Sequence, residues 1–126
     1  MNQVTYAVRD GHAEWAGRSL QDWVPDLVAT IVAAFDPAKI VLFGSVAHGT
    51  DGPDSDIDLL VVLDEAPLTD RRRLMVELRR ATRAITAPHD VLVTSLDDFE
   101  RNQASPGTTE FEPAQRGVLI HERSAA

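Results

Sequence analysis

The sequence of 126 residues contains no cysteine. A chain without thiols has neither a disulfide framework nor a thiolate metal site, so cysteine redox chemistry is excluded. No stretch approaches the ~20 apolar residues that a membrane-spanning helix requires. Residues 1–6 lack the basic and apolar regions of a secretory signal peptide. These absences predict a protein that is neither inserted in a membrane nor exported, with a cytoplasmic location.

Basic residues are scarce compared with acidic ones. Lysine and arginine together number 12 against 20 aspartates and glutamates, which gives a formal net charge of −8. A field of this sign repels nucleic acid, so we expect any contact with a polyanion to be local. The sequence also has no low-complexity segment, repeat or linker. Because 44% of the residues are apolar, enough for one core, residues 1–126 are predicted to form a single domain.

A periodic apolar pattern predicts a first core helix. Its apolar residues recur at helical spacing at Val24, Leu27, Val28, Ile31, Val32 and Phe35. The helix is expected to end before Pro37, and its N-cap is either Ser19 or Asp22. Pro25 favours Asp22, because proline is tolerated in the first turn of a helix but not further in.

Shorter apolar runs predict the remaining elements. A Gly/Asp/Pro-rich loop separates the first two strands, and Pro88 is expected to end the second helix. The predicted strands cover residues 39–43, 57–63, 90–94 and 118–121, and the further predicted helices cover about 69–87 and 95–103. This alternation of helices and strands indicates an α/β (α+β) domain.

Two carboxylates stand at alternate positions where the second predicted strand begins. Asp56 and Asp58 point to one face, whereas Ile57 and Leu59 point to the other. Their Cα atoms are expected about 6.6 Å apart, so the two charges would repel each other. Such a pair needs either a shared proton or a cation. Magnesium suits it, because Mg²⁺ prefers hard oxygen ligands and is usually completed by substrate phosphates.

Three further residues complete this candidate site. Asp90 opens the third predicted strand and is expected to face the same way as the pair, so that three carboxylates surround two ions. Gly44 allows a sharp turn after the first strand, and the Ser45 hydroxyl with neighbouring amides can hold a phosphate oxygen. A lone Gly-Ser is usually an ordinary turn, and a lone Asp-x-Asp is usually a solvated loop or a calcium-like cluster of oxygen ligands. Their combination in this order favours a metal-bound nucleotide site.

These residues carry a family resemblance. Gly44-Ser45, ten intervening residues, Asp56-Ile57-Asp58 and the later Asp90 resemble the signature of the polymerase-β-like nucleotidyltransferase superfamily, specifically its minimal nucleotidyltransferase (MNT) group. The resemblance covers about residues 25–121 and leaves residues 1–18 unassigned. It implies a polymerase-β-like palm, in which a small mixed sheet is packed by helices on one face and carries the active site on the other.

The resemblance also implies roles for individual residues. Gly44 and Ser45, together with Asp56 and Asp58, would hold the triphosphate of ATP or another nucleoside triphosphate. Asp56 and Asp58 would bind two Mg²⁺ ions, and Asp90 would bind one of them and help to deprotonate an acceptor hydroxyl. One position departs from the pattern, since many relatives carry arginine where this chain has His48. His48 is therefore either an ordinary loop residue or a partly charged phosphate contact.

The length of the chain and the resemblance suggest what the acceptor is. We expect 126 residues to leave no further domain that grips a nucleic-acid polymer, so the acceptor is a small molecule or a protein. The resemblance implies an antitoxin that transfers AMP to a partner, a HEPN-type ribonuclease toxin, within a hetero-oligomer. The alternatives are nucleotidylation of a small molecule such as an aminoglycoside, and a binding module that neutralises its partner without catalysis.

A cluster of arginines marks the second helix. It comprises Arg71, Arg72, Arg73, Arg79, Arg80 and Arg83, half of all the basic residues. The pattern favours a solvated face on which Glu77 pairs with Arg73 and Arg80, and the alternative is a surface for an acidic partner protein or RNA. The aromatic residues Trp15, Trp23 and Phe35 are expected to pack in or near the core.

Overall fold

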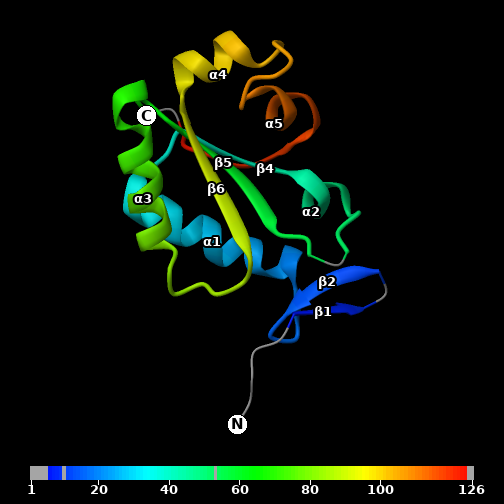
Figure 1. Cartoon of the computed structure of the whole chain (residues 1–126). Helices are drawn as coiled ribbons and strands as arrows, with labels where there is room; N and C mark the ends of the chain where they lie inside the picture. Colours follow the sequence, from blue (N-terminus) through cyan, green and yellow to red (C-terminus); the bar gives the residue numbers. More distant parts are fainter. Residues whose placement is uncertain (1–5, 10, 53, 125–126) are drawn as a thin grey trace.

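The structure is a computed structural model that describes residues 6–9, 11–52 and 54–124. In this part of the chain, two sheets and five α-helices follow one another (Figure 1). The elements are β1 (Tyr6–Arg9), β2 (His12–Trp15), β3 (Arg18–Ser19), α1 (Leu20–Phe35), β4 (Lys39–Phe43), α2 (Gly44–His48), β5 (Ile57–Leu63), the 3₁₀ helix Leu68–Asp70, α3 (Arg71–Ala81), β6 (His89–Ser95), α4 (Leu96–Asn102), α5 (Phe111–Arg116) and β7 (Val118–Glu122).

The main sheet is mixed, with strand order β6-β5-β4-β7. β5 and β6 are parallel, whereas β4 is antiparallel to both β5 and β7. Helices α1 and α3 cover one face of this sheet (Figure 1). The predicted class, a small mixed sheet with helices packed on one face, is therefore confirmed.

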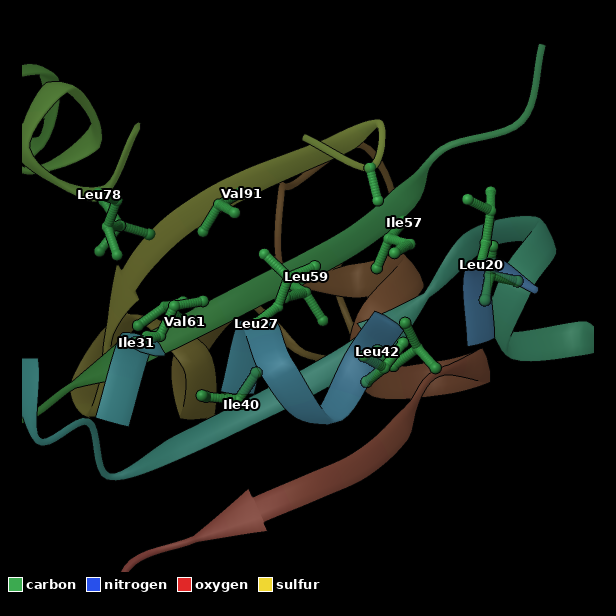
Figure 2. Close-up of a cluster of buried hydrophobic side chains, with 14 of the residues drawn as sticks. Leu20, Leu27, Ile31, Ile40, Leu42, Ile57, Leu59, Val61, Leu78 and Val91 are labelled. Atoms are coloured by element: carbon green, nitrogen blue, oxygen red, sulfur yellow. The ribbon is translucent and has the colours of Figure 1, made fainter. Parts of the chain in front are cut away.

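The strands alternate between the two faces, which creates two apolar clusters. Residues of β4 and β5 such as Ile40, Leu59 and Val61 face α1 in the larger cluster, where Figure 2 shows them beside Leu27 and Ile31. A smaller cluster lies on the opposite face and is formed by Val41, Leu60 and Val62 with Phe43, Leu92, Leu96 and Phe99. The face expected to carry only the active site is therefore partly covered by helix α4. The beginnings of β5 and β6 remain uncovered by α4 and are where the candidate site lies.

The N-terminal residues form an element that the sequence did not predict. β1, β2 and β3 make a three-stranded antiparallel sheet, and Ala13 of β2 is fully buried in the main core. Trp15 and Trp23 pack against this core, as expected. The Trp23 indole N–H donates to the Trp15 carbonyl at 2.9 Å, and the Trp15 indole donates to Thr86 at 3.0 Å. Burial and hydrogen bonding explain these aromatic residues as packing groups, and Phe35 likewise packs against the core.

Helix α1 starts earlier than Pro25 suggested. Its N-cap is Ser19, whose hydroxyl accepts from the backbone N–H of Asp22 at 3.1 Å. The preference for Asp22 as N-cap was wrong, and Pro25 lies inside the helix. Since proline at position 25 cannot donate to the carbonyl of Gln21, one intrahelical bond is missing, but Gln21 is exposed and water can replace it.

Helix α3 is shorter than predicted. It ends at Ala81 rather than near residue 87, and the residues before it form a 3₁₀ turn. The buried Thr82 ends the helix, because its hydroxyl donates to the Leu78 carbonyl at 2.9 Å and also lies 3.1 Å from Nε2 of His89. Five predicted elements match the structure: β4 and β5 have the predicted bounds, and β6, α4 and β7 differ from theirs by no more than a residue at either end.

Two short helices were not predicted. α2 replaces the turn expected after Gly44, and α5 lies in a segment without a clear periodic pattern. The position of α5 is set by Glu110, which is 3% exposed and accepts from the Thr94 hydroxyl at 2.7 Å and from the Asn102 amide at 3.1 Å. A buried carboxylate with two such donors stabilises the turn before α5 through contacts that are not local in sequence.

Candidate active site

The site begins where β4 ends. Phe43 pairs with Asp58 of β5, and the chain then turns into α2 through Gly44, whose φ is +76°. A Cβ atom at this position would overlap a carboxylate oxygen of Asp58 and would lie 3.2 Å from its Cγ atom. Both the left-handed backbone and the close approach require glycine. The turn therefore lies directly against the Asp58 carboxylate.

A hydrogen-bonded loop follows this turn. The Ser45 hydroxyl donates to the Ser55 hydroxyl at 3.2 Å, and the Ser55 oxygen accepts from the backbone N–H of Gly52 at 2.9 Å. The N–H of Thr50 donates to the Ser45 carbonyl at 2.9 Å. These contacts place Ser45 beside the end of the loop that leads into Asp56. Two segments predicted to hold the same ligand, ten residues apart in sequence, are thus adjacent in space.

The loop is anchored to the N-terminal sheet by a residue that sequence reasoning missed. Asp51 is buried and accepts from the backbone N–H of Ala13 at 2.7 Å, while its other oxygen lies 3.1 Å from Nδ1 of His12. A carboxylate held by a buried backbone donor is fixed in position. The only local signal was an aspartate in a Gly/Pro-rich loop, which is typical of an ordinary turn.

The two strands that carry the remaining carboxylates are neighbours. β5 and β6 pair in parallel with Asp58 directly opposite Asp90, so both side chains lie on one face of the sheet. Asp56 immediately precedes β5 and shares this face by alternation. The predicted grouping of the three aspartates at one edge of the sheet therefore agrees with the strand register.

Asp58 has the perturbed titration expected of a crowded carboxylate. Its pKa is raised from 3.8 to about 7, first by burial and then by the charge of Asp56, by a hydrogen bond with Asp56 and by the charge of Asp90. Burial disfavours the charged form, and like charges disfavour it further. A proton shared with Asp56 relieves the repulsion in the metal-free protein. A bound cation would relieve it in the same way.

The three carboxylates do not form a closed metal site. Within residues 6–9, 11–52 and 54–124, no group of three or more Asp, Glu or His side chains converges closely enough to hold an ion. The structure brings Asp56 and Asp58 together, whereas Asp90 is exposed and has the smallest effect on Asp58. Two hard oxygen donors with unfavourable charge repulsion fit Mg²⁺, which takes its other ligands from water and phosphates.

His48 shows no contact that assigns it a role. It is exposed at the last position of α2, and its side chain makes no hydrogen bond or ion pair with any other residue that the structure describes.

Comparison with known proteins identifies the family. Residues 26–114 match the family model described as "Nucleotidyltransferase domain". The chain belongs to this nucleotidyltransferase family. The matched segment includes every residue of the predicted site, which lies in and between β4, β5 and β6. The β1–β3 sheet lies before it, so the Asp51 anchor joins the nucleotidyltransferase segment to residues outside the match.

The fold of this nucleotidyltransferase domain is also found in a known crystal structure. The structure of a candidate nucleotidyltransferase from Sulfolobus solfataricus superposes with a TM-score of 0.61 at 21% sequence identity, covering 82% of this chain and 81% of that one. At this identity the similarity shows a shared fold. No curated protein sequence matches the chain. None of the helices in the described ranges combines the length and the apolar character needed to cross a membrane.

Proposed function

We propose that this domain is a Mg²⁺-dependent nucleotidyltransferase that transfers AMP from ATP to a hydroxyl group of a partner protein. The observation that carries the proposal is the close approach of the Gly44 turn to the Asp58 carboxylate, which itself crowds against Asp56. A phosphate chain placed against this turn would lie beside carboxylates that require a cation. Such an arrangement suits a metal-bound triphosphate.

Each residue of the site has a chemical task in this reaction. Asp56 and Asp58 would hold Mg²⁺, which would supply positive charge against the phosphates. The Ser45 hydroxyl and neighbouring amides orient the triphosphate. Asp90, exposed at the edge of the site, accepts the proton of the acceptor hydroxyl. The acceptor oxygen then bonds to the α-phosphorus while the bond from this phosphorus to the departing pyrophosphate breaks.

The proposed partner is a HEPN-type ribonuclease toxin, which the modification would silence. The resemblance of Gly44-Ser45 and the three aspartates to minimal nucleotidyltransferases supports this pairing. We place the reaction in the cytoplasm, where ATP, Mg²⁺ and the RNA substrates of such a toxin are present. Positioning and electrostatic stabilisation supply most of the catalysis in phosphoryl transfer, so a small palm suffices once the partner presents its hydroxyl in line.

The test uses the protein encoded next to this one. The two proteins are incubated with ATP and Mg²⁺, and the intact mass of the neighbour is measured. An adduct of one or more AMP units is expected, and both Asp56→Ala and Asp90→Ala should abolish it. Asp54→Asn is the matched control, since it removes an exposed carboxylate from the same loop. If wild type and all the variants inhibit the neighbouring protein equally and its mass does not change, the protein acts by binding alone.

A further inference from the structure

Four arginines in α3 and the turn after it have no ion-pair partner among the residues that the structure describes. Arg71 pairs with Asp98, and Arg73 pairs with Asp70 and with Glu77, the latter at 2.9 Å. The expected pair between Glu77 and Arg80 is absent. Among the residues that the structure describes, no carboxylate lies within ion-pair distance of the remaining four, which are Arg72, Arg79, Arg80 and Arg83.

This lack of partners is unexpected for an acidic protein. The chain has 20 acidic residues for 12 basic ones, so most cations should find a carboxylate. Most arginines elsewhere, such as Arg18 with Asp26 and Arg123 with Asp64, do so, and Arg116 is the exception among the described residues. Four positive charges close together in and after α3, with no carboxylate partner in the described part of the chain, repel one another at a cost to stability. Their arrangement is explained if another molecule supplies the carboxylates.

Apolar side chains lie in the same stripe. At 100° per residue, Arg72, Val76 and Arg79 fall on one side of the helix, away from the buried Leu78, and Arg83 follows in the turn after the helix ends at Ala81. Val76 is 46% exposed, and Leu68, one turn before Arg72, is 77% exposed. These are two of the few large apolar side chains that the described residues leave open to water. We call Leu68, Arg72, Val76, Arg79, Arg80 and Arg83 the α3 stripe.

We propose that the α3 stripe is a docking surface for an acidic amphipathic helix of a partner protein. Arginine around small apolar centres is typical of protein interfaces. The turns of α3 repeat about every 5.4 Å, which matches carboxylates at i and i+4 of a second helix. Nucleic acid fits less well, because its backbone offers nothing to Val76 and Leu68, the stripe has no aromatic residue for base stacking, and the net charge is −8.

The position of the stripe links docking to the candidate site. After α3 ends at Ala81, the connection 82–88, which contains Arg83, leads into β6 (Figure 1). This strand begins at His89, the residue before Asp90. A partner helix lying along α3 would be on the face of the sheet opposite the carboxylates, and this connection leads from the end of α3 to the strand that carries Asp90. This surface goes beyond the proposed function, since it would recruit an acidic partner whether or not AMP is transferred.

The experiment contains no nucleotide and uses a defined probe. The ¹⁵N-labelled protein is titrated with a helical peptide of Glu, Leu and Ala about three heptads long, and amide shifts are recorded by NMR. Shifts confined to residues 68–83 are expected with this peptide and not with a Lys-for-Glu version. The variant Arg79→Gln with Arg83→Gln should bind the acidic peptide about tenfold more weakly. Glutamine keeps the helix propensity, so the fold should persist.

A matched variant and a second probe decide the outcome. Arg116→Gln removes an exposed arginine at the end of α5 that has no ion-pair partner in the described ranges, and it should leave peptide binding unchanged. The proposal is overturned by equal binding of wild type and the α3 double variant, or by shifts that map outside residues 68–83. Stronger shifts of the same amides with a single-stranded RNA of similar length would assign the stripe to nucleic acid instead. Peptide binding without an AMP adduct on the neighbouring protein would refute the proposed function alone.

Discussion

Neutralising Asp58 should stabilise the metal-free protein above neutral pH. The unfolded carboxyl has a pKa near 3.8 and the folded one near 7, so between these values the folded state binds more protons. Stability therefore falls as the pH rises from about 4 to 7 and stays low above it. Asp58→Asn removes this loss of stability. The asparagine amide stays neutral at every pH, and it can donate a hydrogen bond to Asp56 as the protonated carboxyl of Asp58 does.

The size of the effect follows from the shift. One pKa unit corresponds to about 1.4 kcal/mol, so a rise from 3.8 to about 7 sets an upper bound of about 4 kcal/mol. Asp58 is only half buried, and solvent screening reduces this to about 1–2 kcal/mol. For a domain of 126 residues, 1 kcal/mol moves the thermal midpoint by about 3–5 °C. The variant should thus melt several degrees higher than wild type at about pH 8.

Urea and thermal unfolding in EDTA measure this gain between about pH 5.5 and 8. The difference between variant and wild type should grow with pH, and Mg²⁺ should stabilise wild type more than the variant. Asp54→Asn is the control, since Asp54 is exposed with φ at +64°, a conformation that asparagine tolerates. A lower midpoint for Asp58→Asn without metal would mean that Asp58 is hydrogen-bonded scaffolding. An equal gain for Asp54→Asn would mean that only net charge matters.

Three further changes test the geometry of the site. Gly44→Ala should destabilise the protein by about 1–2 kcal/mol more than Gly49→Ala in urea unfolding. Both glycines have positive φ, but only at Gly44 would an added Cβ atom overlap another side chain, that of Asp58. Equal losses of stability would contradict the close approach. Asp51→Ala should cost about 1–3 kcal/mol in the same assay, since it leaves a buried backbone N–H unpaired, and an unchanged midpoint would show that the anchor is dispensable. Calorimetry with ATP and Mg²⁺ should detect binding that Asp56→Asn combined with Asp58→Asn abolishes while circular dichroism is unchanged, and binding that survives would place the nucleotide elsewhere.

Much of the site follows from local rules. Strand alternation predicts that Asp56 and Asp58 share a face, and the pairing of β5 with β6 places Asp90 opposite Asp58 as expected. A glycine after a buried strand predicts a sharp turn at residue 44. These relations extend over a few residues or between neighbouring strands, so the sequence pattern contains them.

Local rules fail where distant residues decide the outcome. The end of α3 depends on Thr82 and its contact with His89, and the turn before α5 depends on buried Glu110 with its donor Thr94. A prediction from helix propensity alone extends α3 as far as Pro88 and does not include α5. Tertiary hydrogen bonds outweigh propensity differences of less than about 1 kcal/mol per residue.

The sequence by itself determined the nucleotidyltransferase family and the face of the sheet on which Asp56, Asp58 and Asp90 lie, because side-chain alternation along a strand is a local rule. Only the tertiary structure decided how these residues are held. Asp51 meets Ala13 across 38 residues, and Gly44 touches Asp58 because β4 and β5 pair in one register. It also decided that Glu77 pairs with Arg73 and not with Arg80. Contacts of this kind depend on how the chain packs, and no spacing along the sequence specifies them.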